Sequence, residues 1–243
     1  MREIRLYTSQ SLSEGHKLLL DEAAAHHLAR VLRARVGDAV TLFNGGGLDW
    51  PCRIVQMDKR RVEVTVGPAA PVTTESPIVF HLGLCLSKGD RFDWAIQKST
   101  ELGVASITPL FSERVDVKLP AERVQKRVAH WQQIVTSACE QSGRAVVPAV
   151  ATPTELAIWA NDQDADLRLV LHHRQPGGLP TEAPSSVALL VGPEGGLSDT
   201  DLGHAQKAGF QNLKLGPRVL RTETAPAAAL AALGARWGDL AQP

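Results

Sequence analysis

The 243-residue sequence predicts an α/β domain with a mainly parallel sheet, preceded by a small β-rich domain. Short strand patterns separated by turns fill residues 1–70, whereas buried strand patterns alternate with amphipathic helix patterns in residues 71–243. Between the two parts, residues 67–77 are rich in proline and threonine and poor in apolar side chains, as is typical of a linker. We therefore expect two domains, 1–70 and 71–243.

The N-terminal domain is predicted to be a β-rich module with one helix. Strand patterns occupy residues 38–43, 50–57 and 61–66. Residues 21–35 predict a helix, because acidic side chains stand at its start and arginines at its end. Leu28, Val31 and Leu32 fall on one stripe of this helix, which we expect to face the core.

The C-terminal domain shows strands and helices in alternation, which indicates a parallel sheet. Strand patterns occupy residues 81–87, 104–111, 167–172, 187–191 and 213–215. Helix patterns occupy residues 90–102 and 120–142, a stretch that begins at Ser198 and ends at Gly209, and the alanine-rich residues 225–232. Glycines after the helix patterns and capping side chains before them set these boundaries.

Composition excludes several classes of protein. The chain carries 26 basic and 26 acidic side chains, so a nucleic-acid partner would need locally clustered positive charge. No apolar stretch is long enough to cross a bilayer, and charges stand where a secretory signal has its apolar block, so we expect a cytoplasmic protein without a membrane partner. Cys52, Cys85 and Cys139 are odd in number and widely spaced, which predicts small buried side chains instead of disulfides or metal ligands.

Common catalytic motifs are absent from the sequence. It contains no GxxxxGK[ST], no GxGxxG after the first α/β strand, no GxSxG and no HExxH. The side chains of the adjacent pairs His26-His27 and His172-His173 diverge in a helix or a strand, so we expect no metal site there. Phosphate-loop, ordinary dinucleotide, serine hydrolase and zinc chemistry are therefore disfavoured.

Three loops remain as candidates for a ligand site, because open α/β sheets bind ligands at the carboxyl ends of their strands. They are Leu171-His172-His173, residues 192–196 and residues 215–225. The second loop, GPEGG, can turn sharply and bring its backbone N–H and C=O groups close to a ligand such as an adenine edge. A tight strand-to-helix turn also explains GPEGG, and Arg221 and Glu223 could simply pair with each other at a helix start.

Six segments in a fixed order carry a more specific signal. They are KGDR (88–91), IQKSTELGV (96–104), TPLFSER (108–114), CEQSGR (139–144), GPEGGLS (192–198) and LGPRVLRTETA (215–225). Together they resemble the bacterial 16S ribosomal RNA uracil-N3 methyltransferase family of the SPOUT superfamily. The resemblance implies a PUA-like RNA-binding β-barrel, a SPOUT-type trefoil-knotted domain with a mainly parallel sheet, S-adenosyl-L-methionine as cofactor, no metal, and a homodimer. The implied partner is 16S ribosomal RNA or the small ribosomal subunit.

The resemblance also implies roles for individual residues in methylation of N3 of one uridine in the decoding region. The expected cofactor-binding residues are Leu171, His172, Gly192, Pro193, Glu194, Gly195, Gly196, Leu215, Gly216, Leu220, Thr222, Thr224 and Ala225. Arg221 is expected to polarise a uracil carbonyl, while Glu194 or Glu223 accepts the N3 proton. Because N3 pairs in Watson–Crick geometry, the uridine must be unpaired or flipped out.

Basic side chains are expected to position the RNA. The expected substrate-binding residues are Arg5, Arg30, Arg33, Lys88, Arg91, Lys98, Arg114 and Arg144. Arg91, Trp94 and Lys98 share one face of the predicted helix at residues 90–102, although a solvated face explains this pattern as well. Lys59, Arg60 and Arg61 form a further basic cluster. Glu140 and Arg144 suit either a dimer interface or the substrate cleft.

Two other functions stay open at this point. One is a related knotted methyltransferase that acts on a ribose 2′-hydroxyl or a tRNA base, because the loops fit the cofactor whatever the acceptor. The other is an RNA-binding assembly factor that keeps the fold without turnover; the intact loops at 192–196 and 215–225 count against it. A nucleotide-dependent oxidoreductase is disfavoured by the missing GxGxxG.

Overall fold

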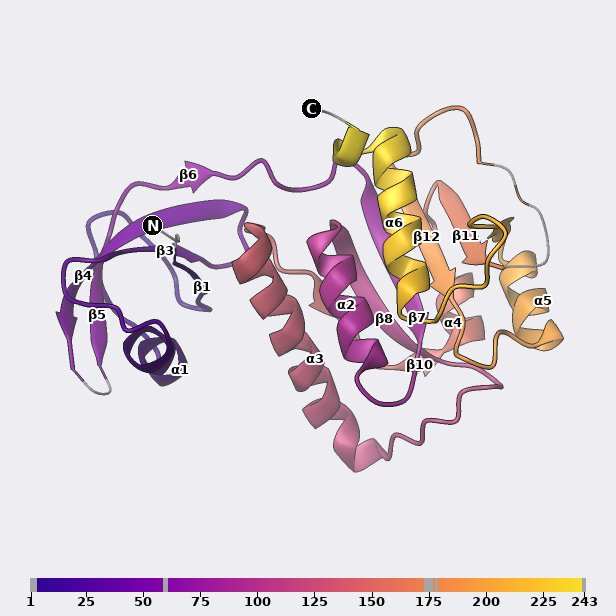
Figure 1. Cartoon of the computed structure of the whole chain (residues 1–243), viewed down its shortest axis with the longest axis horizontal. Helices are drawn as coiled ribbons and strands as arrows, with labels where there is room; N and C mark the ends of the chain where they lie inside the picture. The colour runs from indigo at the N-terminus through magenta and orange to yellow at the C-terminus, as the bar shows by residue number, and fades with distance from the viewer. Residues whose placement is uncertain (1–3, 59–60, 173–176, 178, 242–243) are drawn as a thin grey trace. The chain divides into compact units, whose positions relative to one another are not determined.

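The computed structural model describes residues 4–58, 61–172, 177 and 179–241, and the chain divides into two compact units (Figure 1). The first unit comprises Met1–Glu75 and Cys139–Val147, and the second comprises Ser76–Ala138 and Pro148–Pro243. These limits differ from the expected division at 70/71. The physical reason is a small buried cluster of Phe43, Cys139 and Ala145, which ties the distant segment to the first unit.

The first unit is a mostly antiparallel sheet with one short helical segment. Its elements are β1 (Arg5–Tyr7), β2 (Lys17–Leu19), α1 (Glu22–His26), the π-helix η1 (His27–Val31), β3 (Ala39–Phe43), β4 (Leu48–Met57), β5 (Val62–Val66) and β6 (Ala70–Pro71). The strands follow the order β1-β3-β4-β5-β2, with β6 paired to β4 and only β1 and β3 parallel. The three predicted strands are confirmed as β3, β4 and β5. The remaining strands have two or three residues each, too few to produce a hydrophobic pattern.

The helix expected over residues 21–35 is shorter and less regular than predicted. It begins as expected, with the side chain of Asp21 accepting a hydrogen bond from the N–H of Ala24 at 2.8 Å. It then widens into η1, and Arg33 adopts a φ of 54°, which ends the helix. Because the wider turn changes the helical register, only Leu28 of the expected stripe is buried, whereas the exposed fractions of Val31 and Leu32 are 60% and 37%.

The second unit contains a parallel sheet. Its elements are β7 (Val79–Cys85), α2 (Arg91–Glu101), β8 (Val104–Phe111), α3 (Ala121–Ser142), β9 (Ala149–Val150), β10 (Thr154–Glu155), α4 (Leu156–Asn161), β11 (Leu167–Leu171), β12 (Ser186–Val191), α5 (Asp199–Lys207), β13 (Gln211–Leu213), α6 (Thr224–Trp237) and the 3₁₀-helix η2 (Asp239–Ala241). The last residues of α3, from Cys139, belong to the first unit. The strand order is β10-β8-β7-β12-β11-β13 with β9 beside β8, and all these pairings are parallel. The predicted mainly parallel sheet is confirmed.

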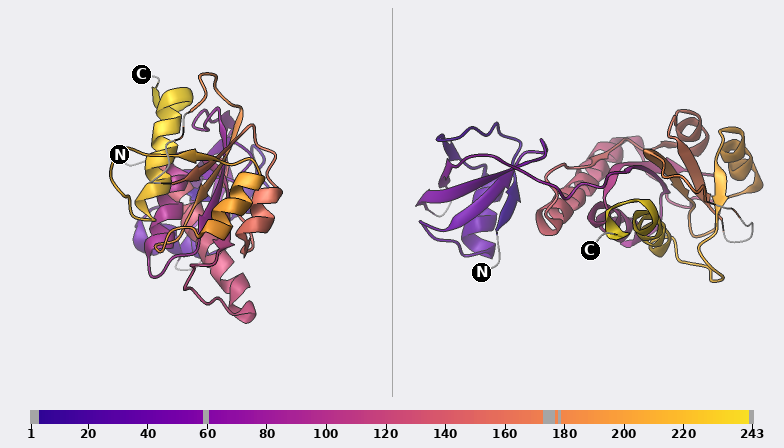
Figure 2. Two further views of the ribbon diagram at one scale, coloured as in Figure 1. Left: turned by 90° about the vertical axis from the view of Figure 1, so that its right-hand side faces the viewer. Right: turned by 90° about the horizontal axis from the view of Figure 1, so that it is seen from above.

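Helices cover both faces of this sheet, with α2 and α6 on one face and α4 and α5 on the other (Figures 1 and 2). On the α4 face, the ring of Trp159 packs directly onto β7 at Gly83, where an added Cβ atom would lie only 2.5 Å from the ring. Cys85, Leu190 and Phe210 complete the apolar packing there. The predicted helices are confirmed as α2, α3, α5 and α6, whereas the short helix α4 was not predicted.

Strand order brings the candidate loops together. Strand β11 lies between β12 and β13 and runs parallel to both, so all three strands end at the same edge of the sheet. The last of them is shifted from the expected residues 213–215 to Gln211–Leu213, which places Leu215 in the following loop. The loops after Leu171, Val191 and Leu213 therefore begin side by side.

The expected burial of the cysteines is confirmed. Cys52, Cys85 and Cys139 are all buried and unpaired. Burial raises the pKa of the Cys85 thiol to about 12, far above neutral pH, so this thiol stays protonated. Within the described residues, no helix is both long and apolar enough to cross a bilayer.

Candidate functional site

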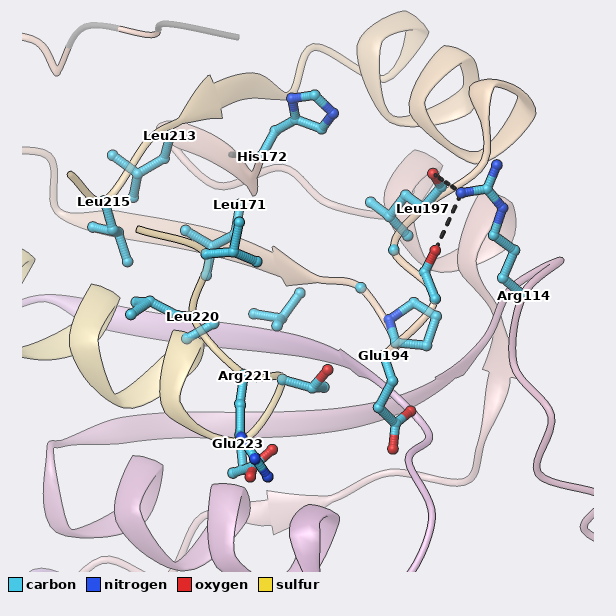
Figure 3. A pocket seen from close by; sticks show the side chains of 18 of the residues that line it. Arg114, Leu171, His172, Glu194, Leu197, Leu213, Leu215, Leu220, Arg221 and Glu223 are labelled. Carbon is cyan, nitrogen blue, oxygen red and sulfur yellow. Dashed lines mark hydrogen bonds between the residues drawn. The ribbon is translucent and has the colours of Figure 1, made fainter. Parts of the chain in front are cut away.

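A cavity of about 750 Å³ lies where β11, β12 and β13 end. Its lining comes mainly from residues 171–172, 191–199 and 213–225, the three segments that follow these strands. Arg91 contributes from the start of α2. Arg114 contributes from the segment that follows β8 (Figure 3). The cavity therefore occupies the position at which parallel α/β sheets bind ligands.

The structure brings the expected cofactor-binding residues together around this cavity, with the exception of Thr224. Thr224 is exposed at the first position of α6. Arg218 and Val219, from the candidate loop at residues 215–225, also line it. Five lining residues were not expected: Val191, Leu197, Asp199, Leu202 and Leu213. Most of them directly flank the expected loop residues in the sequence. Asp199 and Leu202 belong to α5, and they could not be predicted without knowing how this helix packs.

The cavity combines apolar walls with bare backbone. Leu171, Leu213, Leu215 and Leu220 lie on one side of it (Figure 3). On the other side, a Cβ atom at Gly192 would lie 2.9 Å from Cγ of Leu197, so glycine allows this leucine to pack onto the loop. Apolar walls with a few exposed polar backbone groups are typical of a site for a small organic ligand.

Glu194 is held as a carboxylate by its own backbone N–H and by neighbours outside its loop. Its Oε1 atom accepts hydrogen bonds from Nη1 of Arg91 at 2.9 Å and from the backbone N–H of Lys88 at 3.2 Å. Burial by itself would raise the pKa of Glu194, but hydrogen bonds from its own N–H, from Arg91 and from Lys88 outweigh burial and lower the pKa. A carboxylate with a lowered pKa and an occupied oxygen is a weak proton acceptor.

Replacing Glu194 by glutamine is expected to destabilise the protein only where Glu194 is ionised. Because the pKa of Glu194 is lowered on folding, its charge stabilises the fold above the ordinary value of 4.5, and this contribution is lost as pH falls through the lowered pKa. Urea unfolding of both proteins from neutral to acidic pH measures the difference, which should shrink to zero in acid. When Arg91 is already replaced by alanine, Glu194→Gln should lower the free energy of unfolding at neutral pH by less. An equally large decrease would show that the ion pair with Arg91 does not stabilise the Glu194 carboxylate.

Arg221 and Glu223 face the cavity without pairing to each other. Within the described residues, neither side chain has a hydrogen bond or an ion pair, and the Oε2 atom of Glu223 is buried without a partner. The backbone around them is firmly placed, because the N–H groups of Thr224 and Ala225 bond to the carbonyl of Arg221 at 3.0 and 2.9 Å as α6 begins. A guanidinium and a carboxylate are thus both available to a ligand.

Two of the expected RNA-binding arginines lie in buried ion pairs. The guanidinium of Arg5 pairs with Asp49 and donates to the carbonyl of Cys139 at 3.2 Å. Arg144 pairs with Glu75, and the exposed fractions of the Arg5 and Arg144 side chains are 8% and 4%. Both guanidinium groups are thus buried in ion pairs within the first unit, whereas their expected contact with RNA stays a prediction.

Glu140 also has a partner inside the first unit, where it accepts a hydrogen bond from the N–H of Tyr7 at 3.0 Å. Burial raises the pKa of this carboxyl, an effect that the Tyr7 N–H opposes. This contact joins the end of α3 to β1. It gives Glu140 a partner within the first unit, and the expected role in a dimer interface or the substrate cleft stays a prediction.

Of the other expected RNA-binding residues, Arg91 and Arg114 line the cavity, and the remaining four form two groups. Lys88 and Lys98 form ion pairs with Asp116 at 2.8 Å and Glu101 at 2.7 Å, of a partly exposed kind that contributes little to stability. Arg30 and Arg33 are exposed, and their side chains show no partner among the described residues. Lys59, Arg60 and His173 lie outside the described residues. In the described part of the chain, no group of three or more potential ligands could hold a metal ion.

Comparison with known proteins gives matches over nearly the whole chain. The RNA methyltransferase domain family matches residues 74–234, and the RNA methyltransferase PUA domain family matches residues 20–67. Over 239 residues the chain is 33% identical to ribosomal RNA small subunit methyltransferase E of Buchnera aphidicola subsp. Schizaphis graminum, covering 97% of both chains. Its identity to the Bacillus subtilis protein of the same name is 30%, covering 93% of both chains.

Two solved structures resemble this chain closely. A Legionella pneumophila protein, solved with bound S-adenosylmethionine, has a TM-score of 0.94 and 40% identity, covering 99% of this chain and 100% of that one. Ribosomal RNA small subunit methyltransferase E from Neisseria gonorrhoeae, also bound to S-adenosylmethionine, has a TM-score of 0.92 and 38% identity, covering 98% and 99%.

Proposed function

Because the chain belongs to the ribosomal RNA small subunit methyltransferase E family, we propose that it methylates N3 of one uridine in 16S ribosomal RNA, with S-adenosyl-L-methionine as the methyl donor. The observation that carries this proposal is the cavity at the ends of β11, β12 and β13, which the GPEGG loop and residues 215–225 line together. Arg221 and Glu223 stand there with their charged groups unpaired among the described residues. The site thus offers a ligand cavity and a pair of groups suited to proton removal.

The residues of the cavity fit S-adenosyl-L-methionine. Its volume of about 750 Å³ suits a ligand of this size. Leu171, Leu215 and Leu220 supply apolar walls for the adenosine, and the backbone groups of residues 192–196 supply hydrogen bonds. When bound, S-adenosyl-L-methionine provides a methyl group that is already activated on a positively charged sulfur.

The protein's own groups then act on the uracil. N3 of uracil carries a proton, and removing that proton spreads negative charge onto the neighbouring carbonyl oxygens. In this proposal the guanidinium of Arg221, which lines the cavity, donates hydrogen bonds to such an oxygen and favours the anion. Glu223 accepts the N3 proton in this proposal, because the carboxylate of Glu194 is already bound by Arg91 and Lys88.

A nucleoside analysis tests the proposed reaction. Small subunits from a strain that lacks the modification are incubated with the protein and labelled S-adenosyl-L-methionine, and the 16S RNA is digested for mass spectrometry. Labelled 3-methyluridine supports the proposal. A label on a ribose 2′-hydroxyl, or only on tRNA, would establish the alternative acceptors instead. Calorimetry that shows no cofactor binding would favour the non-catalytic assembly factor.

RNA positioning is proposed to involve Arg30 and Arg33, which are exposed and free of partners in the described structure. Removing both by alanine substitution should weaken RNA binding and lower the slope of log affinity against log salt by about 1 to 2, since each phosphate contact releases about one counterion. A fluorescence titration at several salt concentrations measures the slope. The matched control is Arg123→Ala/Lys126→Ala, which removes two exposed charges from α3. If the slope falls equally in both variants, Arg30 and Arg33 make no specific contact with the RNA phosphates.

The trefoil knot, the homodimer and a cytoplasmic location belong to the same proposal. The knot and the dimer are implied by the resemblance of segments such as residues 192–198 and 215–225, and a ribosomal RNA substrate implies the cytoplasm. Light scattering during gel filtration measures the oligomeric state. A monomer at all concentrations would contradict the dimer without affecting the proposed reaction.

A further inference from the structure

The GPEGG loop needs support from outside itself to hold one shape. Three of its residues are glycines, which have the largest backbone freedom to lose on folding. Its own structure supplies one backbone hydrogen bond, from the N–H of Gly196 to the carbonyl of Pro193 at 2.9 Å, with Gly196 at a φ of 70°. A ligand that binds to this backbone gains most affinity if the loop is already ordered.

Arg114 supplies part of that support. Its Nη1 atom donates hydrogen bonds to the carbonyl oxygens of Gly195 at 3.1 Å and Leu197 at 3.3 Å (Figure 3). The stem of the side chain follows the loop as well, because a Cβ atom at Gly195 would lie 3.4 Å from Cβ of Arg114. One guanidinium nitrogen thus joins two carbonyls of the loop to the segment that follows β8.

A second anchor holds the other part of the loop. The carboxylate of Glu194 accepts hydrogen bonds from Arg91, the first residue of α2, and from the backbone N–H of Lys88, which lies between β7 and α2. Gly195 and Leu197 line the cavity themselves, so fixing their carbonyl groups also fixes part of the cavity wall. The two anchors come from different strand ends and act on successive residues.

We propose that Arg114 is a positioning residue for the methyl donor: it shapes the GPEGG loop through the carbonyls of Gly195 and Leu197 instead of binding RNA phosphates. This inference rests on the proposed function, because it takes S-adenosyl-L-methionine as the ligand of the cavity. Removing Arg114 therefore weakens donor binding and leaves the RNA salt slope unchanged.

The test compares two ligands by calorimetry. S-adenosyl-L-methionine carries a carboxylate and an amino group, whereas 5′-methylthioadenosine lacks both but shares the adenosine part. We expect Arg114→Ala to weaken both ligands by a similar factor of about 10, because hydrogen bonds from a charged donor are lost in the loop and not on the ligand. Arg114→Lys, which keeps one charged donor, should recover part of the affinity. Arg123→Ala, an exposed arginine on α3, is the control.

Each outcome has a definite meaning. A loss confined to S-adenosyl-L-methionine would overturn the proposal, because it would show that Arg114 binds the carboxylate directly. Unchanged affinity for both ligands, or a lower RNA salt slope, would overturn it as well. Thermal melting without ligand checks that Arg114→Ala is folded, and Arg114→Lys gives the same comparison if it is not. Failure of the wild-type protein to bind either ligand would instead contradict the proposed function.

Discussion

Replacing Arg221 by alanine is expected to lower kcat/KM for RNA methylation by a factor of about 100 to 1000, while the affinity for S-adenosyl-L-methionine changes little. The size follows from the loss of one charged donor at the place where negative charge develops on the uracil carbonyl. Affinity is preserved because the side chain of Arg221 has no partner among the described residues, so its removal disturbs none of the described contacts of the cavity wall. Labelled-methyl transfer measures the rate, and calorimetry measures cofactor affinity.

Lys214→Ala is the matched control for this experiment, because Lys214 is an exposed cation in the same loop and does not line the cavity. It should leave the rate nearly unchanged. If Arg221→Ala weakens cofactor binding as much as it slows methylation, Arg221 belongs to cofactor binding. Unchanged turnover would remove Arg221 from the mechanism altogether.

The position of the candidate site could be predicted from the sequence, because it depends on strand ends. Buried strand patterns before GPEGG and before residues 215–225 are enough to place both loops at one edge of a parallel sheet. The apolar residues Leu171 and Leu220 follow from the same reasoning, and both line the cavity. The structure adds that β11 separates the two strands that carry these loops.

The partners of charged side chains could not be predicted in the same way. Arg114 and Arg91 are basic residues in motifs that suggested RNA, yet they bond to a loop 81 and 103 residues further along the chain. Arg5 reaches Asp49 across 44 residues. A pattern within one segment shows which face a side chain occupies, but it does not show which distant group meets it there.

The irregular geometry of the first helix could not be predicted from the sequence either. Residues 21–35 have acidic residues, arginines and leucines where a regular helix requires them, but the structure inserts a π-helix at His27–Val31 and a left-handed residue at Arg33. Such features depend on tertiary contacts that the local pattern does not contain, and Leu28 within this π-helix is fully buried. The result is that Arg30 and Arg33 stand exposed beside Val31 instead of at the end of a longer helix.

Replacing Arg144 by alanine is expected to destabilise the first unit by about 3 kcal/mol without changing the salt dependence of RNA binding. Removing one partner of a buried ion pair leaves the other charge uncompensated, which typically costs about 3 to 5 kcal/mol. We expect the lower of these values because the side chain of Glu75 is 30% exposed, so water can solvate its charge in part. Arg144 also links the linker residue Glu75 to the segment after α3, so its loss loosens both ends.

The measurement must follow the first unit separately, because two compact units need not unfold in one step. Hydrogen exchange of peptides from β4 and β5 reports its stability, and Arg35→Ala, an exposed arginine of the same unit, is the control. Glu75→Gln should be at least as damaging as Arg144→Ala, because it leaves the nearly buried guanidinium without its counter-charge. If Arg144→Ala instead kept full protection and lowered the salt slope of RNA binding, Arg144 would contact phosphate after all. Hydrogen exchange and the salt dependence of RNA binding together therefore distinguish arginines that stabilise the fold from arginines that bind the RNA.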